Sequence, residues 1–212
     1  MSNLAVLHEA IYKGQIGKMA GLVQKEIESG TPIRAIIDDG LIWAMGVIGK
    51  KFKNNEIFIP EVLISAKAMQ AGMKVLEPHL VKNDIRPFAK VVIGTVKGDL
   101  HDIGKNIVAM MFKGAGFEVT DLGIDVQPKK FADACRQSQV DILAMSSLLT
   151  TSMNTMSETI QMLTASGLRE SVKVMVGGAP VTQEFANRIG ADGYARDAAS
   201  AVDRAKELLR KT

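Results

Sequence analysis

The spacing of apolar residues divides the chain into two parts with different periods. Over the first 80 residues apolar positions recur at intervals of three and four, which predicts helices over residues 4–12, 16–27, 32–52 and 60–80. Gly30 provides a stop for the second helix, and Thr31-Pro32 provides a cap and a first position for the third. Four helices with short connections predict an antiparallel bundle. The predicted apolar face of the second helix consists of Ile16, Met19, Ala20, Val23 and Ile27.

From Lys90 onward the pattern changes to short apolar runs that alternate with helical spacing. The runs predict strands over 90–96, 117–121, 140–146, 172–177 and 191–194, and helices that start near residues 103, 128, 152, 182 and 197. Five successive strand–helix units predict an α/β fold with a doubly wound five-stranded parallel sheet, Rossmann-like or flavodoxin-like. The polar, proline-containing stretch 83–88 marks the boundary, so we expect a helical bundle domain over 1–86 and an α/β domain over 87–212.

Composition narrows the class of protein. The chain has 212 residues, of which 47% are hydrophobic and 23% charged, enough to bury a sizeable core. Its 26 basic and 23 acidic residues are spread without long runs of like charge, so we expect neither a nucleic acid nor a membrane as partner. The sequence starts without a basic region followed by a long apolar stretch, which favours a cytoplasmic protein. The single cysteine, Cys135, is expected to be a small buried hydrophobe.

The first strand of the α/β part leads into a loop that could hold a metal. This loop, residues 98–104, places His101 between Asp99 and Asp102 and begins and ends with glycine. In parallel α/β sheets such loops lie at the carboxyl ends of the strands, where ligands bind. A histidine can bind a metal through one ring nitrogen while a carboxylate such as Asp99 accepts the proton on the other. By itself the same loop also fits a solvated histidine.

Two further loops at this edge of the sheet are small and polar. The third strand is followed by a hydroxyl-rich stretch, residues 146–152, and the fourth by Gly177-Gly178. Hydroxyls at a strand end can be helix caps, and paired glycines can form a turn. Together the three loops could instead form a groove for a long ligand, which favours a cofactor with a tail.

Two common proteins with such a sheet fit this sequence poorly. A phosphoryl-accepting receiver domain needs an aspartate at the carboxyl end of the third strand, whereas Asp141 lies at the beginning of that strand. A flavodoxin needs a hydroxyl-rich phosphate loop after the first strand, where this chain has residues 97–101, Lys-Gly-Asp-Leu-His. Neither class explains the histidine loop.

Three motifs together resemble a known signature. Asp99-Leu100-His101-Asp102-Ile103-Gly104, Ser146-Ser147-Leu148 and Gly177-Gly178 resemble the Asp-x-His-x-x-Gly, Ser-x-Leu and Gly-Gly pattern of cobalamin-binding domains, with 41 and 28 residues between the motifs. In the helical half, Phe52 and the stretch 58–63, Phe-Ile-Pro-Glu-Val-Leu, resemble the helical cap of methionine synthase and of small corrinoid proteins of methylotrophic methyltransferase systems. The resemblance covers nearly the whole chain.

The resemblance implies a role for each matched residue. His101 would be the axial ligand to the cobalt of a cobalamin whose own base is displaced, with Asp99 accepting the other ring proton and Ser152 extending this relay. When the metal releases His101, Asp99 would hold the protonated ring. The remaining loop and tail-pocket positions would be Asp102, Gly104, Ser146, Leu148, Thr150, Gly177, Gly178 and Tyr194. A cap over the upper face of the corrin would consist of Phe52, Ile59, Val62 and Leu63, although an apolar stripe of this kind is also typical of ordinary bundle core.

The function implied by this resemblance is that of a methyl carrier in one-carbon metabolism and methylotrophy. A substrate-specific corrinoid methyltransferase would transfer a methyl group from a methylated substrate to the bound cobalamin, giving methylcobalamin, and a second methyltransferase would pass the methyl group to a thiol or a tetrahydrofolate-type acceptor. A reductive reactivation protein is a further expected partner. The chain itself is expected to be a non-catalytic component of this system. Two alternatives stay open, a cobalamin-dependent sensor or regulator, and the cobalamin subunit of an adenosyl-dependent mutase. The sequence leaves the methyl donor, the oligomeric state and the lower base of the corrinoid undetermined.

Overall fold

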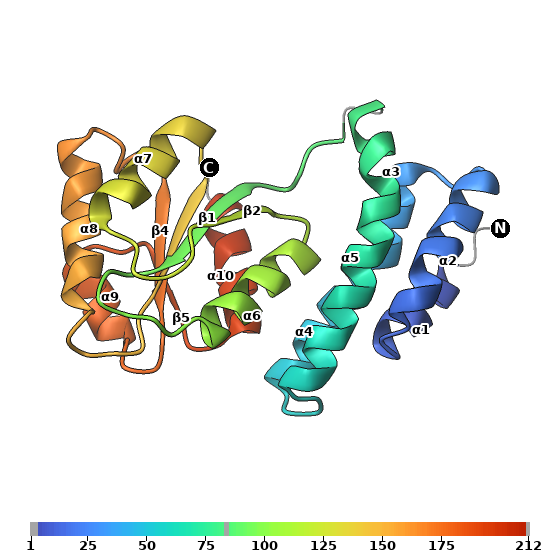
Figure 1. Cartoon of the computed structure of the whole chain (residues 1–212), viewed down its shortest axis with the longest axis horizontal. Coiled ribbons are helices and arrows are strands. Elements are labelled where there is room, and N and C mark those ends of the chain that lie inside the picture. The colour runs from blue at the N-terminus through green and yellow to red at the C-terminus, as the bar shows by residue number, and fades with distance from the viewer. Residues whose placement is uncertain (1–3, 83–84, 211–212) are drawn as a thin grey trace. The chain divides into compact units, whose positions relative to one another are not determined.

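The protein consists of two compact units, which Figure 1 shows in a computed structural model. The structure describes residues 4–82 and 85–210. One unit contains residues 1–87 with 113–116, and the other contains residues 88–112 and 117–212. The division separates the helical part of the sequence from the strand-and-helix part.

The first unit is built from helices, as the apolar spacing predicts. Its elements are α1 (Ala5–Tyr12), α2 (Ile16–Glu28), α3 (Ile33–Ala35), the π-helical η1 (Ile36–Ile42), α4 (Trp43–Lys53) and α5 (Ile59–Lys82). The segments α3, η1 and α4 follow one another without a break, so they correspond to the predicted third helix. Apolar side chains of α1, α2, η1, α4 and α5 form the core of this unit, among them Leu7, Ile11, Met19, Leu41 and Leu76.

Three details of this unit differ from the sequence-based expectation. On α2 only Met19 and Val23 are buried, whereas Ile16 is 41% exposed and Ala20 is also exposed. The predicted face was too wide because α2 turns a narrow strip toward α5, where Gly72 lies against both buried side chains. The expected cap at Thr31 is wrong as well, since its hydroxyl donates to the Glu26 carboxylate at 2.7 Å and Pro32 occupies the N-cap. The π-helical turn was not predicted.

The second unit alternates strands and helices. Its elements are β1 (Lys90–Thr95), α6 (Ile103–Gly114), β2 (Glu118–Asp121), α7 (Pro128–Ser138), β3 (Ile142–Ser146), α8 (Asn154–Ala165), β4 (Lys173–Gly177), α9 (Gln183–Ile189), β5 (Gly193–Ala195) and α10 (Ala198–Arg210). The five strands form one parallel sheet in the order β2-β1-β3-β4-β5. The predicted doubly wound five-stranded sheet is therefore confirmed, and each strand lies within two residues of its predicted limits.

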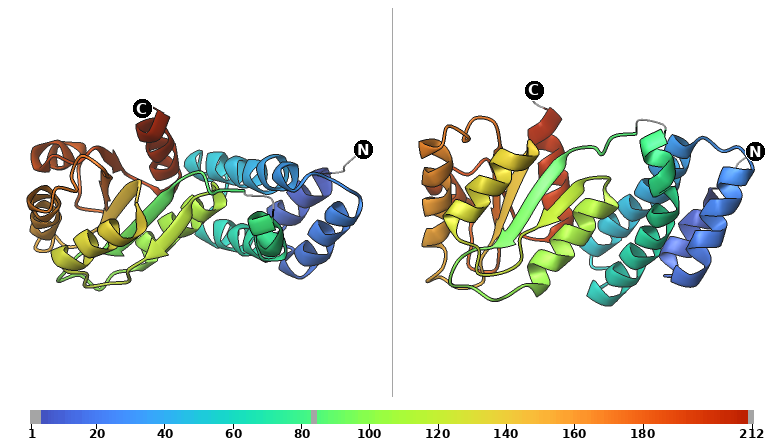
Figure 2. Two further views of the ribbon diagram at one scale, coloured as in Figure 1. Left: turned by 90° about the horizontal axis from the view of Figure 1, so that it is seen from above. Right: turned by 45° about the horizontal axis from the view of Figure 1, so that its top comes forward.

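Helices cover both faces of this sheet. Figures 1 and 2 show α7, α8 and α9 on one face and α6 and α10 on the other. Burial on both faces explains why the central strands are almost continuously apolar, for example Ile142–Met145 in β3. On the α7–α9 face, Phe131, Leu143, Met156 and Leu163 belong to one buried apolar cluster. Cys135 also lies in this cluster, and burial raises the pKa of its thiol to about 11, as expected for an inert core residue.

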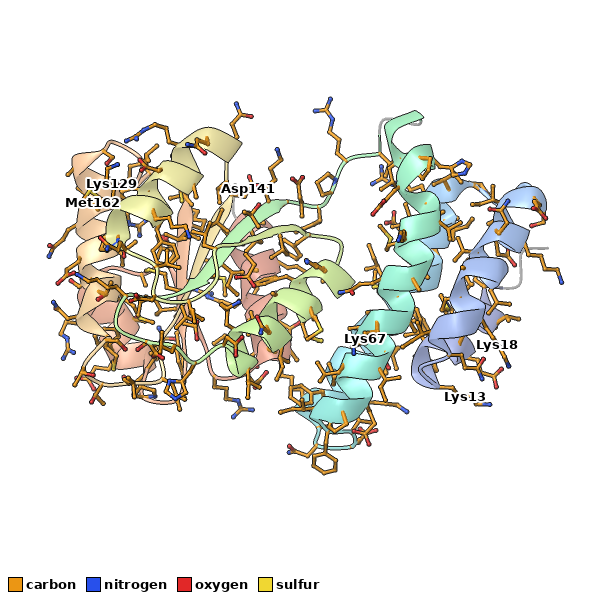
Figure 3. The ribbon with its side chains drawn as sticks, viewed as in Figure 1. Lys13, Lys18, Lys67, Lys129, Asp141 and Met162 are labelled. Atoms are coloured by element: carbon orange, nitrogen blue, oxygen red, sulfur yellow. The ribbon has the colours of Figure 1, made fainter. Side chains whose placement is uncertain are left out.

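The order of the strands creates a topological switch point at the carboxyl edge of the sheet. β1 lies between β2 and β3, so the chain leaves β1 toward one face and β3 toward the other. Ligands of open α/β sheets bind at such a switch point, outside the carboxyl ends of the strands. Asp141 lies at the opposite edge, where β1 and β3 begin (Figure 3), and its carboxylate accepts a hydrogen bond from the Lys90 backbone at 2.7 Å. Asp141 therefore aligns the strands at the edge opposite to this switch point.

Among residues 4–82 and 85–210, none of the helices has the length and apolar character that crossing a membrane would require.

Candidate functional site

A hydrogen-bonded aspartate–histidine pair follows β1 at this switch point. Asp99 is fully buried, whereas the side chain of His101 is 53% exposed. The carboxylate oxygen Oδ1 of Asp99 lies 2.7 Å from Nδ1 of His101 and also accepts the His101 backbone N–H at 3.0 Å. An ionised carboxylate can only accept hydrogen bonds, so Nδ1 carries a proton, and in the neutral ring the lone pair is on Nε2. The ring is therefore oriented to bind a metal through Nε2.

Asp99 also joins this loop to the neighbouring loop after β3. Its second oxygen, Oδ2, accepts hydrogen bonds from the backbone N–H groups of Leu148 at 2.5 Å and Leu149 at 3.3 Å. Burial by itself would raise the pKa of Asp99, but hydrogen bonds from the backbones of His101, Leu148 and Leu149 and from the His101 ring outweigh it and lower the pKa to about 2. The carboxylate is therefore ionised at neutral pH, and this charge fixes the tautomer of His101.

Two buried serines extend the pair. The hydroxyl of Ser152 lies 3.3 Å from Oδ2 of Asp99, and the hydroxyl of Ser147 lies 2.7 Å from that of Ser152. Because each hydroxyl has one proton, the chain requires Ser147 to donate to Ser152 and Ser152 to donate to Asp99. The Leu149 carbonyl competes for both protons, at 3.0 Å from each hydroxyl oxygen. The geometry allows Ser152 the position predicted for it, and Ser147 is a member of the chain that the sequence did not single out.

The backbone of His101 is anchored to the end of β1. The buried hydroxyl of Thr95 donates to the His101 carbonyl at 2.9 Å. The backbone N–H of Asp99 donates to the Val96 carbonyl at 3.2 Å. Thr95 could not be predicted from the sequence, because a hydroxyl at the end of a buried strand has many alternative partners.

The loops after β3 and β4 touch through their backbones. The N–H of Ser147 donates to the Gly177 carbonyl at 3.1 Å, and Ser146 pairs with Gly177 in the sheet. Gly178 has φ +124°, and a Cβ built on it would lie 1.8 Å from the Ser147 carbonyl oxygen. Any larger residue at 178 would therefore push the two loops apart. The structure thus brings Ser146, Gly177 and Gly178 together at the ends of β3 and β4.

Other predicted loop residues have different surroundings. Asp102 accepts hydrogen bonds from Asn106 through its carboxylate and its carbonyl, at 3.0 and 2.8 Å, so it caps the first turn of α6. Gly104 is exposed in that turn, with open space around its Cα. Thr150 is exposed in the loop after β3. Tyr194 lies in β5 and packs, partly buried, against the apolar cluster of the α7–α9 face.

Large apolar side chains are exposed in the loops after β1, β2 and β3 and at the beginning of α6. They are Leu100 from the loop after β1, Ile103 from the first turn of α6, Ile124 from the loop after β2, and Leu148 and Leu149 from the loop after β3. We call these five residues the apolar rim. Hydrogen bonds of Asp99 and Asp125 connect the three loops, so the apolar rim adjoins the exposed imidazole. Exposed apolar residues gathered in this way are typical of a ligand-binding surface. The sequence pointed only to Leu148, since isolated apolar residues in polar loops carry no periodicity.

The four predicted cap residues differ in exposure. Val62 is fully buried, on the same stripe of α5 as Ala66 and Met69. Phe52 and Leu63 are partly exposed, and Ile59 is 41% exposed. Val62 therefore offers no free surface to a ligand, and the interpretation of this residue as bundle core is the better one. The other three have exposed surface on the helical unit.

The donor set of the site fits a cofactor that brings most of its own metal ligands. Within the parts of the chain that the structure describes, no three His, Cys, Asp or Glu side chains come close enough to hold a metal together. A macrocycle that supplies most of the metal's donors needs a single protein nitrogen, which the exposed ring of His101 offers. The apolar rim beside this nitrogen suits the face of such a macrocycle.

Comparison with known proteins agrees with this geometry. Residues 89–203 match the family described as B12 binding domain, and residues 4–77 match a second family with the same description. The chain is 41% identical to a corrinoid protein of Desulfitobacterium hafniense (strain Y51) over 214 residues, which covers 100% of this chain and 99% of the relative. It is 42% identical to dimethylamine corrinoid protein 1 of Methanosarcina mazei over 207 residues, covering 97% and 95%.

Solved structures give the same result. A cobalamin-binding protein from Desulfitobacterium hafniense DCB-2 superimposes with a TM-score of 0.80 and 34% identity over 100% of both chains. The methanol:cobalamin methyltransferase complex MtaBC from Methanosarcina barkeri contains a chain that superimposes with a TM-score of 0.86 and 31% identity, covering 97% of this chain and 79% of that chain. Both units of the chain thus match domains of one class, and the chain belongs to the family of cobalamin-binding corrinoid proteins.

Proposed function

We propose that this protein carries a methyl group on its corrinoid between two methyltransferases. One partner is a substrate-specific enzyme that loads the carrier, and the other passes the methyl group to a thiol or a tetrahydrofolate-type acceptor. The buried Asp99 carboxylate that orients the exposed imidazole of His101 is the observation that carries this proposal. The names of relatives, dimethylamine and trimethylamine corrinoid proteins at 39–46% identity, support it and make a methylated amine the first donor to test.

In this proposal the cofactor supplies a cobalt centre that accepts and releases the methyl group, and the protein supplies ligation and proton control. His101 binds through Nε2 while Asp99 holds the proton on Nδ1. When Nε2 is free it can take a proton, and the resulting imidazolium is held by the ionised Asp99, 2.7 Å from Nδ1. Ser152 and Ser147 keep the other oxygen of Asp99 hydrogen-bonded. The pair is thus suited to an imidazole that binds a metal and dissociates from it repeatedly.

We further propose how the remaining residues share the cofactor. Ser146, Thr150, Gly177 and Gly178 would line the pocket for the nucleotide tail, with Tyr194 toward its far end. The apolar rim would lie against the lower face of the corrin, with Asp102 and Gly104 at the beginning of α6 beside it. Phe52, Ile59 and Leu63 of the helical unit would shield the upper ligand, and Val62 would support them from the core.

Reconstitution with cobalamin tests the ligation directly. The Co(II) form should show nitrogen hyperfine structure from His101 in its electron paramagnetic resonance spectrum. His101→Ala should lose this protein nitrogen and keep part of the affinity for the tail, whereas His8→Ala, in the helical unit, should keep the wild-type spectrum. Wild-type protein that retains no corrinoid at micromolar concentration would overturn the proposal.

A second measurement separates the carrier from its alternatives. Reconstituted protein is offered a methylated amine with its methyltransferase, and the upper ligand is identified by its visible spectrum and by mass spectrometry. A methyl group is the expected result. Preferential retention of an adenosyl ligand would instead favour a sensor or a mutase subunit. The same assay, with a thiol and with a tetrahydrofolate as acceptors, identifies the second partner, and oxidation of the cofactor during turnover would reveal the need for a reductive reactivation protein.

A further inference from the structure

The loop between β2 and α7 runs along the loop that contains His101. The carboxylate of Asp125 accepts the Gly98 backbone N–H at 2.8 Å, and the backbone N–H of Asp125 donates to the Asp99 carbonyl at 3.1 Å. One residue later, Val126 accepts the Lys97 backbone N–H at 2.9 Å. Asp125 therefore contacts the two residues that lead into His101, once through its side chain and once through its backbone.

The backbone of Asp125 is held in an unusual conformation. Its φ is +51°, in the left-handed region that residues other than glycine adopt at a cost of about 1 kcal/mol. Aspartate and asparagine tolerate this region better than most residues. The conformation turns the N–H of Asp125 and its carboxylate toward the same segment, Gly98-Asp99. A short polar side chain is thus needed at this position for both contacts.

The segment that leads from β2 to α7 also contacts the beginning of α6, which follows His101 in the chain. The buried ammonium group of Lys105, in the first turn of α6, donates to the Asp121 carboxylate at 2.5 Å and to the Asn106 side chain at 2.7 Å. Asp121 also accepts the Gly123 backbone N–H at 2.9 Å. Residues 121–126 thus contact the chain on both sides of His101. Asp125 bonds to the residues before it, and Asp121 bonds to Lys105 after it.

We infer that Asp125 is a positioning residue for the metal ligand, and this inference rests on the proposed function. By fixing the backbone of Gly98 and Asp99, it sets where the Asp99 carboxylate meets the ring of His101. Gly98 is exposed, so its N–H can bind water when the Asp125 carboxylate is removed. Removal of the Asp125 carboxylate should therefore lower the free energy of unfolding only a little. It should, however, let the backbone of Gly98 and Asp99 and the direction of the His101 ring vary.

Two substitutions separate positioning from folding. Asp125→Gly removes the carboxylate and fits the left-handed backbone without strain, whereas Asp125→Asn keeps an oxygen acceptor and tolerates the same backbone. Gln139→Gly is the matched control, because Gln139 has φ +46° at the end of α7, a left-handed residue outside the histidine loop. Urea unfolding of all variants measures stability.

The first readout uses the protein without cofactor. The exchange rate of the His101 Nδ1 proton with water is measured by NMR on ring-labelled protein, with His101→Ala as the assignment reference. Asp125→Gly should raise this rate about fivefold, the change that corresponds to one ordinary hydrogen bond, and Asp125→Asn should be close to wild type. The unfolding midpoint of Asp125→Gly should fall no more than that of Gln139→Gly.

The second readout is the fraction of bound Co(II) corrinoid with nitrogen hyperfine structure, which Asp125→Gly should lower and Asp125→Asn should preserve. Equal exchange rates and equal ligated fractions in wild type and Asp125→Gly would overturn the inference. So would an Asp125→Gly protein that fails to fold, since Asp125 would then act on the fold as a whole. Wild-type protein that takes up no corrinoid overturns the proposed function alone, because the exchange rates still decide the role of Asp125.

Discussion

Replacing Asp99 by asparagine should reverse the tautomer of His101. Both oxygens of Asp99 accept hydrogen bonds, Oδ1 from His101 and Oδ2 from Leu148, Leu149 and Ser152. Asparagine has only one oxygen, so its NH2 group must face one of these two sets of donors. The NH2 group should face the ring, because Nδ1 can lose its proton and accept a hydrogen bond, whereas the backbone N–H groups of Leu148 and Leu149 cannot. The proton then resides on Nε2, and the ring can no longer bind a metal through this atom.

The structure also gives the size of the effect on stability. With the NH2 group of the asparagine turned toward His101, the backbone N–H of His101 loses its acceptor, which costs about 1 to 3 kcal/mol. The ionised carboxylate contributes a pH-dependent part. Because the pKa falls from 3.8 to about 2 on folding, this part is at most about 2.4 kcal/mol, and less where water reaches the loop. It is fully present above pH 3.8 and is lost as the pH falls through about 2. Wild type and Asp99→Asn should therefore differ most near pH 7 and converge toward pH 2.

Urea unfolding between pH 7 and pH 2 measures this convergence, and nitrogen NMR of the ring identifies the tautomer. Asp133→Asn is the control, because Asp133 forms exposed ion pairs with Lys129 and Arg136 on α7, where such pairs contribute little. It should follow the wild-type curve within about 0.5 kcal/mol. A constant difference between wild type and Asp99→Asn over the whole pH range, together with an unchanged ring spectrum, would refute the reasoning.

Three other substitutions test neighbouring parts of the site. Ser152→Ala removes one hydroxyl donor to Asp99, which keeps its charge and becomes the stronger acceptor, so the ring should keep its proton on Nδ1; a shift of the ring spectrum toward that of Asp99→Asn would mean that Ser152 itself determines the tautomer. Gly178→Ala should lower the free energy of unfolding by roughly 2 to 4 kcal/mol, because the new methyl group meets the Ser147 carbonyl; a loss below about 1 kcal/mol would show that the loops separate easily. Phe52→Ala should speed photolysis of bound methylcobalamin with little change in the free energy of unfolding. Val62→Ala should instead lower the free energy of unfolding in urea by about 1 to 3 kcal/mol. The reverse pattern would make Val62 the shielding residue and Phe52 the core residue.

The sequence was most informative where one period dominates. The strands of the α/β unit are continuous apolar runs because both faces of the sheet are covered, and such runs are easy to recognise. The helical unit was harder, since Ile16 and Met19 are equally apolar but only Met19 faces α5. The π-helical turn at Ile36–Ile42 was not predicted, because seven residues are too few to change a periodicity that is read over windows of about 11–18 residues.

The site divides in a similar way. Asp99 and His101 are two residues apart in a tight loop, so their hydrogen bond could be expected from the sequence alone. The donors from Leu148 and Leu149 could not, because they depend on β3 lying beside β1 rather than elsewhere in the sheet. The contact between Asp125 and Gly98 could not be predicted either, because it depends on β2 lying on the other side of β1. Contacts that cross between loops require the strand order, which local patterns do not contain.

This strand order has a consequence for the chemistry of the site. Asp99 is the one residue, among those described in the two loops, whose carboxylate bonds both to the histidine and to the backbone of the loop after β3. That second loop also contacts Gly177 through Ser147, next to the proposed pocket for the nucleotide tail. A displacement of the loop by the tail would therefore move the acceptor of the Nδ1 proton as well. Occupation of the proposed tail pocket and orientation of the histidine would thus be coupled through one carboxylate, so the nitrogen NMR spectrum of the His101 ring should differ between a bound corrinoid with its nucleotide tail and one without it.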